Sequence, residues 1–418
     1  MDVMVATARS PVQGGRRVPS SKSLHQRALF LAALSERDTR LEAGDARPGD
    51  DVRRLRAALQ ALGPRWIDGA LGASRERVEV DLGLGATGFR YAMAAATLRP
   101  AGATTLVRGQ PGLLRRPHAV LRRALGTLGG HVRRRHSGAM RVIGGGVQGR
   151  PLTVRADVSS QYASALLLLA PRIGGLELTL VDRPVSRPYL ELTLSVLEAF
   201  GVPVEATGLD GPGACIRVSE AAPRLDVFPI EADASCGAPW WAAAVLTGGE
   251  AWIEDLPADT RQADAALLPV LERMGAAVDA GPGGSALVRG PKRLVAPGDV
   301  DLVDASDLVP VVGVLAAAAE GETRIHGAGH VQHKESDRLR TVAGGICALG
   351  GHAEVDGTDV VIRGGGLTGG QVDVAGDHRI ALAFGVLGLR VPGVLLRGAE
   401  AVDKSYPSFL DELAAAAG

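Results

Sequence analysis

The feature that most constrains the fold is a helix ending that recurs along the chain. A helical pattern finishes in apolar-x-x-apolar-Gly five times, at a spacing of about 65–75 residues. The five copies are Leu59–Gly63, Leu125–Gly129, Leu197–Gly201, Leu271–Gly275 and Ile346–Gly350. Glycine suits the residue after a helix because it adopts the left-handed conformation easily. A further helix pattern, Phe409–Ala417, has no strand-like segment after it. We therefore expect six related units.

A second pattern alternates with the first one. Small or polar residues open an Ala/Leu-rich helix after Ser21-Lys22-Ser23, Gly85-Ala86-Thr87, Ser159-Ser160-Gln161, Asp233-Ala234-Ser235, Asp304-Ala305-Ser306 and Asp377-His378-Arg379. A turn with glycine and then a strand pattern usually follow. Each unit thus reads as strand–helix–strand–helix–strand–strand. The sixth unit lacks its last strands, and we expect the N-terminal strand Asp2–Ala8 to complete it.

Six units divide naturally into two domains of three. Since the N-terminal strand belongs with the sixth unit, we expect one domain over residues 20–230 and a discontinuous second domain over 1–19 and 231–418. The chain would cross between them near Pro19 and near Pro229–Ala232. If the helix starts face one cleft, their positive dipole ends would attract a strongly anionic substrate. The alternative is that the repeated N-caps only stabilise their helices.

Composition narrows the class of function. Acidic and basic residues balance at 46 each, which argues against a nucleic-acid binder that works through a broad basic field. The longest apolar run, Val309–Ala319, is too short to cross a bilayer, and Met1–Ser10 has no apolar signal region. The three cysteines form no Cys-x-x-Cys pair, so we expect reduced core thiols and a cytoplasmic protein. We also expect a monomer that binds neither nucleic acid nor membrane.

Lysine is rare in this chain and therefore informative. Only four of the basic residues are lysines, so arginine is used wherever charge alone suffices. Lys292 follows Gly290-Pro291 and reads as a surface residue. The other lysines and several arginines lie at or near helix starts, where they are candidate ligands of phosphate and carboxylate groups. These cations are Lys22, Arg27, Arg116, Lys334, Arg338, Arg379 and Lys404.

Two carboxylates stand among these cations. Asp307 and Glu335 are candidate proton-transfer groups, because acids at an anion site need a reason to be there. For Asp307 the structural alternative is a partner of the helix dipole in a first turn. The run Lys334–Arg338 alone would read as a solvated helix start. The sequence lacks a P-loop, a His-Glu-x-x-His motif and a Gly-x-Ser-x-Gly elbow, so it points to no NTPase, zinc or serine-hydrolase chemistry.

With these residues assembled, the chain resembles the 3-phosphoshikimate 1-carboxyvinyltransferase (EPSP synthase) family over essentially its full length. The motifs that carry the resemblance are Ser21-Lys22-Ser23 with Arg27, Ser159-Ser160-Gln161, Ser186-Arg187-Pro188-Tyr189, Lys334-Glu335-Ser336-Asp337-Arg338, Asp377-His378-Arg379 and Lys404-Ser405-Tyr406-Pro407. The resemblance implies an α/β fold of two inside-out α/β barrel domains, each with three βαβαββ repeats. It places the active site in the cleft between the domains.

The resemblance also implies a reaction. Phosphoenolpyruvate would transfer its enolpyruvyl group to the 5-hydroxyl of shikimate 3-phosphate, through a tetrahedral ketal, with release of phosphate and with no metal or organic cofactor. By likeness Asp307 deprotonates the hydroxyl, Glu335 handles the proton at C3, and Lys22 lies close to both substrates. Shikimate 3-phosphate would be held by Lys22, Ser23, Arg27, Ser159, Ser160, Gln161, Ser186, Tyr189, Asp307, His330 and Lys334. Phosphoenolpyruvate would be held by Lys22, Ala86, Thr87, Arg116, Gln161, Arg338, Arg379 and Lys404.

The sequence departs from the family pattern at several places. Ala86 replaces a common glycine, Tyr91 a common proline and His330 a common asparagine, and the loop Gly109–Leu114 is less polar than usual. The sequence Ala86-Thr87-Gly88-Phe89-Arg90 resembles that of the herbicide-tolerant branch of the family. We expect a structural role for Arg90. We hypothesise that the Ala86 methyl weakens the binding of glyphosate more than the binding of phosphoenolpyruvate. These changes leave open a paralogous carboxyvinyl transferase that acts on a related acceptor in specialised metabolism.

Two further alternatives are weaker. The related UDP-N-acetylglucosamine enolpyruvyl transferases typically have Lys-Asn where this chain has Lys22-Ser23, and a cysteine that residues 105–120 lack. A non-catalytic homologue that kept only the anion cleft would gain nothing from Asp307 and Glu335. Both observations favour an enzyme that resembles the EPSP synthase family.

Overall fold

A computed structural model describes residues 1–44, 47–63, 66–67, 70–72 and 74–418 of the chain. The chain divides into two compact units. Unit 1 comprises Met1–Ser21, Gly44–Gly49 and Glu231–Gly418, and unit 2 comprises Lys22–Ala43 and Asp50–Ile230. The sequence did not point to the excursion at Gly44–Gly49. The domains predicted from the sequence, residues 20–230 and residues 1–19 with 231–418, stay a prediction.

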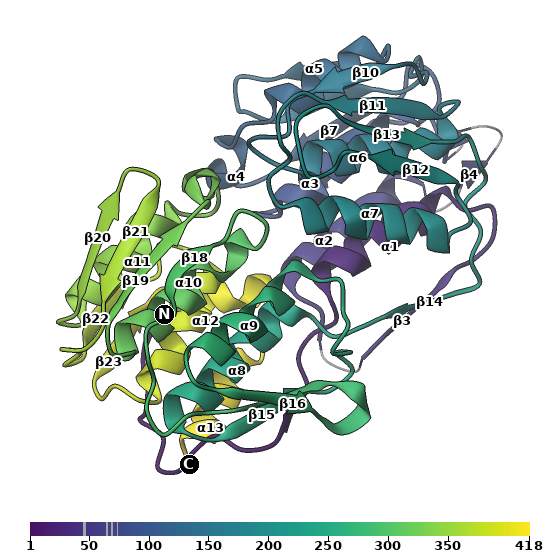
Figure 1. Cartoon of the computed structure of the whole chain (residues 1–418). Helices are drawn as coiled ribbons and strands as arrows, with labels where there is room; N and C mark the ends of the chain where they lie inside the picture. The colour runs from purple at the N-terminus through teal and green to yellow at the C-terminus, as the bar shows by residue number, and fades with distance from the viewer. Residues whose placement is uncertain (45–46, 64–65, 68–69, 73) are drawn as a thin grey trace. The chain divides into compact units, whose positions relative to one another are not determined.

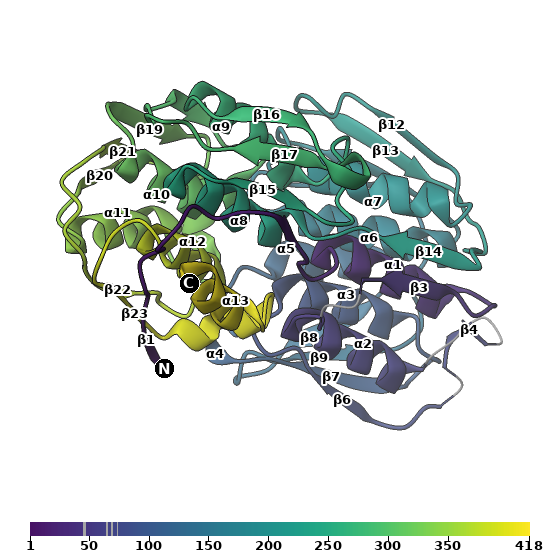
Figure 2. The ribbon, with the colours of Figure 1, turned by 90° about the horizontal axis from the view of Figure 1, so that it is seen from below.

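The centre of unit 2 is a group of three helices in mutual contact, α1 (Lys22–Leu34), α3 (Ala86–Thr97) and α6 (Gln161–Leu169). Beyond Gln161, every residue of α6 is buried, as expected for a helix that is apolar on all sides. The other helices of this unit are α2 (Asp50–Leu62), α4 (Pro111–Leu114), α5 (Ala119–Thr127), α7 (Arg187–Ala199) and the 3-10 turn η1 (Ala170–Arg172). Figures 1 and 2 show the central helices with strands on the outside of the unit.

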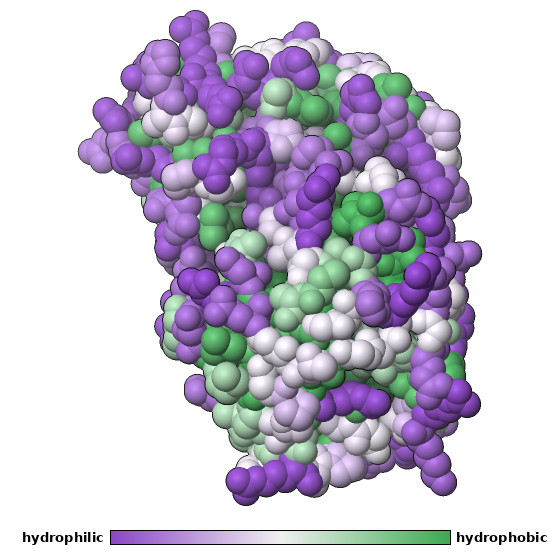
Figure 3. Space-filling model, turned by 90° about the vertical axis from the view of Figure 1, so that its left-hand side faces the viewer, coloured by the Kyte–Doolittle hydropathy of each residue, from purple (hydrophilic) through white to green (hydrophobic). Residues whose placement is uncertain are grey.

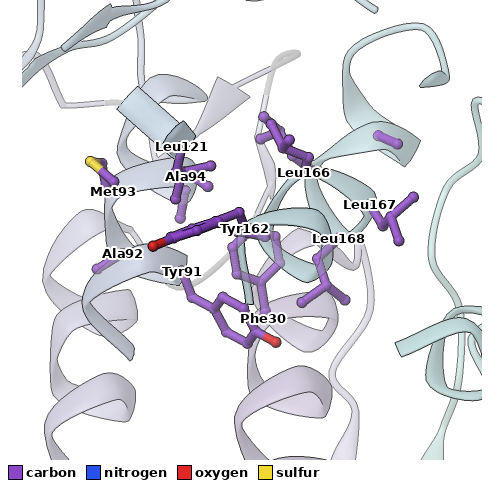
Figure 4. Close-up of a cluster of buried hydrophobic side chains, with 14 of the residues drawn as sticks. Phe30, Tyr91, Ala92, Met93, Ala94, Leu121, Tyr162, Leu166, Leu167 and Leu168 are labelled. Carbon is purple, nitrogen blue, oxygen red and sulfur yellow. The ribbon is translucent and has the colours of Figure 1, made fainter. Parts of the chain in front are cut away.

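Aromatic and aliphatic side chains join the central helices of unit 2 (Figure 4). Phe30 of α1 meets Tyr91 of α3 edge to face, with ring centroids 5.7 Å apart. Tyr162 and Leu166 of α6 complete this core, and all four side chains are fully or almost fully buried. Burying each such side chain contributes about 1.5–3 kcal/mol, so this cluster fixes the relative positions of the three helix starts.

The sheets of unit 2 repeat one strand order. In the order β6-β7-β9-β8 the first two strands are parallel and the other neighbours antiparallel, and β10-β11-β13-β12 is built in the same way. The third sheet pairs β3 with β14 in parallel, and β4 with β5 forms a small ladder. The strands are β3 (Arg40–Ala43), β4 (Trp66–Ile67), β5 (Ala70–Leu71), β6 (Val78–Asp81), β7 (Thr104–Arg108), β8 (His131–Arg134), β9 (Met140–Ile143), β10 (Leu152–Val154), β11 (Leu176–Leu180), β12 (Val204–Thr207), β13 (Ala214–Val218) and β14 (Val227–Ile230).

Unit 1 follows the same plan. Its central helices α8 (Ala234–Thr247), α10 (Val309–Ala318) and α12 (His378–Gly388) contact one another and are almost entirely buried. Its other helices are α9 (Leu267–Arg273), α11 (Arg338–Ala348) and α13 (Phe409–Ala417). Its 3-10 turns are η2 (Ala263–Ala266), η3 (Pro282–Gly284), η4 (Ser306–Leu308), η5 (Gly329–His333) and η6 (Ala399–Lys404).

The sheets of unit 1 have the orders β2-β15-β17-β16, β18-β19-β21-β20 and β1-β23-β22. The strands are β1 (Asp2–Met4), β2 (Gly15–Arg16), β15 (Glu250–Ile253), β16 (Ala277–Ala280), β17 (Ala286–Arg289), β18 (Gly298–Asp301), β19 (Glu322–His326), β20 (His352–Asp356), β21 (Asp359–Arg363), β22 (Gly370–Asp373) and β23 (Val394–Arg397). The N-terminal strand pairs antiparallel with β23 in the last sheet, as the sequence predicted, although it is shorter than Asp2–Ala8.

Two sheets take their first strand from a distant part of the sequence. β15 has β2 as its parallel neighbour, and β3 has β14. The chain then crosses between the units directly after these strands. At the crossings Ser20 pairs with Ala232 in an antiparallel bridge, and Asp233 N donates to Pro19 O at 2.9 Å. The two crossing segments are therefore joined to each other within unit 1.

The sequence patterns locate the helices well. The glycines that end the five apolar-x-x-apolar-Gly patterns all have positive φ, between 73° and 122°. The last helix pattern, Phe409–Ala417, has the bounds of α13.

The exposed surface carries few large hydrophobic side chains. Among the described residues these are Met1, Met4, Val181 and Val295. Figure 3 shows one face, on which hydrophilic residues are interspersed with smaller areas of hydrophobic ones. Within the described part of the chain, no helix combines the length and the apolarity that a membrane span requires.

Candidate active site

Charged side chains gather in unit 1 around Asp307. The segments that carry them lie at helix starts or in the turns before them, namely η4, the residues after η5, the start of α11, the start of α12 and the end of η6. We call the following residues the charged cluster: Asp307, Lys334, Glu335, Arg338, Asp377, Arg379 and Lys404. The structure thus brings together predicted site residues that are up to 97 positions apart in the sequence (Asp307 to Lys404, 404 − 307).

Asp307 is held by three cations. Its Oδ1 lies 2.5 Å from Lys334 Nζ and 2.5 Å from Arg338 Nη1, and its Oδ2 lies 2.7 Å from Arg379 Nη2. Burial raises the pKa of Asp307. The charges of the cations, led by Arg379, lower it by a larger amount, so the pKa lies well below its usual range. In this arrangement Asp307 is ionised at neutral pH and is a weak base.

Glu335 is the second carboxylate of the cluster. Its Oε2 lies 3.0 Å from Arg338 Nη2, and its Oε1 forms an ion pair with Lys404 Nζ. Arg338 also binds Asp377 through Nε at 2.8 Å, so one guanidinium joins the three carboxylates of the cluster. Burial lowers the pKa of Arg338, but the three carboxylates together raise it above its ordinary value. Arg338 is only 1% exposed and remains a permanent cation.

Carboxylates also cap two of the three central helices of unit 1, and Asp337 caps α11 in the same way. Asp233 caps α8 by accepting from Cys236 N at 3.0 Å, and Asp377 caps α12 by accepting from Arg379 N at 3.0 Å. The alternative of ordinary N-caps therefore holds for these two helices. In unit 2, by contrast, α3 and α6 have no side-chain cap at their N-termini. Their first N–H groups suit an anion better than those of α8 and α12.

Arg27 connects three of the helices that carry predicted ligands of shikimate 3-phosphate. Its guanidinium donates to Ser23 O at 2.8 Å in α1, to Ser164 Oγ at 3.4 Å in α6 and to Tyr189 O at 2.8 Å in α7. Arg27 Nε donates to Thr193 Oγ1 at 2.8 Å, and the residue is 2% exposed. Its contacts make Arg27 a residue that positions the neighbouring ligands.

Gln161 is tied to the start of α5 through Arg90. Arg90 donates to Gln161 Oε1 and, at 3.3 Å, to Pro117 O, and its guanidinium lies 4.8 Å from the centre of the Tyr162 ring. Tyr162 Oη donates to the same Pro117 O at 2.6 Å. These contacts fix the backbone next to Arg116, which is half-buried. The structural role that the sequence suggested for Arg90 agrees with this geometry.

Lys22 begins α1 and faces Asp51. Its Nζ lies 3.3 Å from Asp51 Oδ2, and Gln26 Nε2, one turn later, donates to Asp51 O at 3.1 Å. A Cβ atom added to Gly85, the N-cap of α3, would lie 2.9 Å from Asp51 Oδ1. Asp51 therefore lies between the start of α1 and the start of α3, and a side chain at 85 would require Asp51 to shift.

The remaining predicted ligands of unit 2 lie at helix starts. Ser159 Oγ accepts from Gln161 N at 3.3 Å, and Ser160 is the buried N-cap of α6. Ser186 is the N-cap of α7 with φ 55° and ψ 46°, a left-handed conformation that few residues other than glycine adopt. Such backbone strain is often found at functional sites. Ala86 and Thr87 form the first turn of α3.

The departures from the family pattern now have local explanations. Tyr91 is fully buried in the core against Phe30, so it changes packing. The apolar loop is the short helix α4, whose Leu113 and Leu114 are buried. His330 Nε2 lies 2.9 Å from Ser306 Oγ, and burial together with the nearby charge of Lys334 lowers the pKa of His330 to about 4. His330 is therefore a neutral polar group at neutral pH, as an asparagine would be.

Several site residues were missed from the sequence. Asp51, Ser306 and Asp377 contact predicted residues directly, but each of them reads as an ordinary acid or hydroxyl at a helix start. Ser235 and Asp264 extend the charged cluster beyond Arg379. Only the fold brings these groups together, so the sequence carries no separate signal for them.

The cysteine prediction needs one correction. All three cysteines are free thiols, but only Cys236 is buried, whereas Cys215 is half-buried and Cys347 is exposed. Cys347 lies near the C-terminal end of α11. Among the described residues, no group of three or more His, Cys, Asp or Glu side chains has the arrangement of a metal site.

Comparisons with known proteins all match one family. The family model of EPSP synthase (3-phosphoshikimate 1-carboxyvinyltransferase) matches residues 6–413. The 3-phosphoshikimate 1-carboxyvinyltransferase of Halobacterium salinarum is 36% identical, with 97% of this chain and 96% of the relative covered. The enzyme of that name from Methanosphaerula palustris is 35% identical, with 97% of each chain covered.

Solved structures show the same fold. EPSP synthase from Acinetobacter baumannii superimposes with a TM-score of 0.77 at 22% identity, covering 100% of this chain and 98% of that one. The enolpyruvyl transferase NikO from Streptomyces tendae gives a TM-score of 0.72 at 20% identity, covering 99% and 96%. The family model matches almost the whole sequence, and relatives above 30% identity match over nearly their full length. The chain belongs to the EPSP synthase (3-phosphoshikimate 1-carboxyvinyltransferase) family.

Proposed function

We propose that this protein transfers the enolpyruvyl group of phosphoenolpyruvate to the 5-hydroxyl of shikimate 3-phosphate and releases phosphate. The observation that carries the proposal is the charged cluster itself. Two carboxylates, Asp307 and Glu335, are held on one buried guanidinium, that of Arg338, among three further cations. Four cations suit a substrate pair that brings two carboxylates and two phosphates. Two carboxylates suit a reaction with two proton transfers of opposite sense.

In this mechanism Asp307 takes the proton of the 5-hydroxyl while the oxygen attacks C2 of phosphoenolpyruvate. Lys334, Arg338 and Arg379 hold the pKa of Asp307 low. Substrate phosphate and carboxylate groups would draw these cations toward themselves. Their pull on Asp307 would then weaken, and its pKa would rise toward the range of a useful base. The proposed base is thus activated by the binding of the anions on which it acts.

Glu335 supplies the other proton transfer. The addition gives a proton to C3, and the later elimination removes a proton from C3 while the bond between C2 and phosphate breaks. One group must therefore act first as acid and then as base. Glu335 is mostly buried beside Lys404 and Arg338, which hold it in place for both steps. Side chains serve both transfers, so the proposed chemistry needs no metal or organic cofactor.

We assign the remaining predicted residues to the two substrates. Shikimate 3-phosphate would bind Lys22, Ser23, Ser159, Ser160, Gln161, Ser186, Tyr189, His330 and Lys334, with Arg27 in support. Phosphoenolpyruvate would bind Lys22, Arg116, Gln161, Arg338, Arg379, Lys404 and the start of α3 at Ala86 and Thr87. We propose that units 1 and 2 correspond to the two domains, that their arrangement is the inside-out barrel of the family, and that both contribute to one active site. We further propose a cytoplasmic monomer that acts without nucleic acid or membrane.

The test is phosphate release with phosphoenolpyruvate and shikimate 3-phosphate. We expect Glu335→Gln to lower kcat by about 100-fold or more, because general acid–base catalysis contributes that much, while calorimetry still detects binding of shikimate 3-phosphate. The matched control is Glu354→Gln, an exposed carboxylate on β20, which should leave kcat unchanged. Unchanged turnover in Glu335→Gln would refute the catalytic assignment.

One observation favours a second candidate, a carboxyvinyl transferase with a related acceptor. His330 takes the place of an asparagine that commonly meets the substrate, and its ring is bound to Ser306. Failure to release phosphate with shikimate 3-phosphate, in a protein that still consumes phosphoenolpyruvate with other phosphorylated hydroxy acids, would favour this candidate. Release with shikimate 3-phosphate at a normal rate would exclude it.

A further inference from the structure

Asp264 is a buried carboxylate next to the charged cluster that the mechanism above does not use. It lies in η2 and is 2% exposed. Its Oδ2 accepts a hydrogen bond from Ser235 Oγ in the first turn of α8. Ser235 Oγ in turn accepts from Arg379 Nη2 at 3.2 Å, and the same Nη2 lies 2.7 Å from Asp307 Oδ2. A continuous chain of contacts therefore joins Asp264 to Asp307.

The local packing does not explain why a carboxylate occupies this position. Asp264 Oδ1 is buried and has no hydrogen-bond partner among the described residues. The nearest cation, Arg379 Nη1, is 3.9 Å from Oδ2, too far for a hydrogen bond. A buried carboxylate with one unpaired oxygen destabilises a fold. The neighbouring Gln262 already anchors this turn through several hydrogen bonds. An asparagine would fit at 264 at lower cost, so the charge itself needs a reason.

Arg379 is the group on which Asp264 can act. Its Nη2 is shared between Ser235 and Asp307, so the guanidinium has an anchor on each side. A small cavity of about one water volume lies beside it, lined by Ser235, Asp307 and Arg379 among apolar side chains of α8, α10 and α12. Contacts to Ser235 and to Asp307 restrict the orientation of this guanidinium. Its orientation decides which way its remaining N–H groups point.

We propose that Asp264 is a positioning residue for Arg379, which it holds through Ser235 in the orientation that binds the anionic groups of phosphoenolpyruvate. This inference rests on the function proposed above and deepens it. Asp264 touches no reacting atom in this scheme. It acts only through Ser235 and Arg379, so its removal should selectively weaken the binding of phosphoenolpyruvate.

The proposal implies a particular dependence on pH. The charged groups that face Asp264 are Arg379 of α12, Asp307 of η4 and Asp233 before α8. Burial raises the pKa of Asp264 to about 6, against the opposing effect of Arg379. At about pH 8 Asp264 is ionised and anchors Arg379 fully. As the pH falls through about 6 it becomes neutral, and the anchor weakens.

Steady-state kinetics of Asp264→Asn provide the test. Asparagine keeps the shape and one acceptor oxygen but removes the charge. At about pH 8 we expect the KM for phosphoenolpyruvate to rise about tenfold, the effect of losing one charge-assisted contact, while the KM for shikimate 3-phosphate changes less than about twofold. The acidic limb of kcat/KM for phosphoenolpyruvate near about pH 6 should become shallower, because only the titration of the substrate phosphates remains. Equal rises in both KM values, or an unchanged acidic limb, would overturn the proposal.

A second measurement does not depend on turnover. A carboxyl group whose pKa is raised in the folded state adds stability below its unfolded pKa and loses it as the pH rises through the folded value. Asp264→Asn should therefore gain thermal stability relative to the wild type between about pH 5 and about pH 8. The control Asp299→Asn, an exposed aspartate on β18, should follow the wild type at both values.

These two measurements separate the inference from the proposed function. A wild-type protein that releases no phosphate would refute the function, and the stability measurement would then decide on Asp264. Parallel stability curves of Asp264→Asn and the wild type would overturn the inference whatever the activity. Ser235→Ala keeps Asp264 but breaks the link to Arg379. It should raise the KM for phosphoenolpyruvate as Asp264→Asn does, and a normal KM in this variant would count against the link.

Discussion

At the scale of single residues, the choice between lysine and arginine is the most informative feature. Three lysines, Lys22, Lys334 and Lys404, are buried or half-buried. Each of them faces a carboxylate with a compact ammonium group. Buried arginines such as Arg27, Arg90 and Arg338 instead use several N–H groups at once to join distant segments. Each ammonium group is thus a compact charge, whereas the guanidinium groups join several segments at once.

We predict that Lys22→Arg loses most of the activity although it keeps the charge. Lys22 Nζ faces Asp51 in the restricted space between the starts of α1 and α3. A guanidinium there would bind Asp51 with two N–H groups and would point its charge away from the substrates. We expect kcat/KM for phosphoenolpyruvate to fall by about 100-fold or more, because misplacement of a group by about 1 Å costs that much.

The matched control for this variant is Lys292→Arg. Lys292 is the one exposed lysine, so its replacement should leave kcat/KM unchanged. A Lys22→Arg enzyme that retains at least half of the wild-type activity would show that charge alone suffices at this position.

A second prediction at this scale concerns Ala86. Its methyl group lies in the first turn of α3, whose N-terminus has no side-chain cap, and the residue is 7% exposed. Glyphosate is larger than phosphoenolpyruvate, so the methyl should hinder it more. We expect Ala86→Gly to tighten glyphosate inhibition by about tenfold, the effect of relieving one close contact, with less than about a threefold change in the KM for phosphoenolpyruvate. Inhibition of the unaltered protein at the level of the glycine variant would contradict this explanation.

The sequence drew attention to Asp307 and Glu335, because acids among helix-start cations are unusual, and the structure places both among cations. The sequence could not predict that Arg338 joins both of them, nor that Arg379 is shared between Asp307 and Ser235. Those contacts depend on side-chain directions at three helix starts that are separate in the sequence. For the same reason Asp51 and Asp264 could not be found, since an acid near a helix start normally reads as a partner of the helix dipole.

At the scale of secondary-structure elements, the two crossing segments depend on one side chain. Gln262 Oε1 accepts from Ser21 Oγ at 2.9 Å and from Ala234 N at 3.1 Å. Its Nε2 donates to Glu231 Oε1 at 2.9 Å and to Ala232 O at 2.7 Å. Gln262 therefore fixes both segments where the chain passes between the units, directly before α1 and α8.

We predict that Gln262→Ala is strongly destabilising. It would leave a buried N–H and a buried carbonyl without partners, so the free energy of unfolding should fall by about 2–4 kcal/mol in a denaturant titration. Gln60→Ala, an exposed glutamine on α2, is the control and should change it by less than about 0.5 kcal/mol. A loss as small as that of the control would mean that other contacts hold the crossings.

The elements themselves were easier to predict than their partners. Glycines after α2, α5, α7, α9 and α11 mark the helix ends, because a positive φ is needed there. Helix starts were found to within a few residues from the small and polar residues before them. The pairing of β14 with β3 and of β2 with β15 could not be predicted, since each joins segments far apart in the chain. Short strands such as β2 have too few residues to show an alternating pattern.

At the scale of the whole molecule, buried titratable groups set the response to acid. Burial lowers the pKa of His25 and His330 to about 4 and that of His118 to about 3, all below the unfolded value of about 6.5. A group with a lowered pKa in the folded state stays neutral there while the unfolded chain takes up the proton. Its contribution to stability is complete above about pH 6.5 and is lost as the pH falls toward the folded value.

Asp264 acts in the opposite direction. Its pKa of about 6 means that the folded protein takes up a proton before the unfolded chain does. Between about pH 7 and about pH 4.5 the unfolded chain therefore gains about three protons on histidines, while the folded protein gains about one on Asp264, a difference of about two. Each proton of difference changes stability by about 1.4 kcal/mol per pH unit, so the histidines prevail.

We therefore predict that the protein loses a few kcal/mol of stability between about pH 7 and about pH 4.5, measured by urea unfolding at several pH values. His118→Gln should reduce the slope of stability against pH by the equivalent of about one proton. Glutamine can keep the hydrogen bond to Leu113 O but cannot titrate. His131→Gln, at an exposed site on β8, should leave the slope unchanged. Asp264→Asn should make the loss steeper, since it removes a group that opposes the histidines. A slope that does not respond to His118→Gln would mean that acid acts on the molecule through other groups.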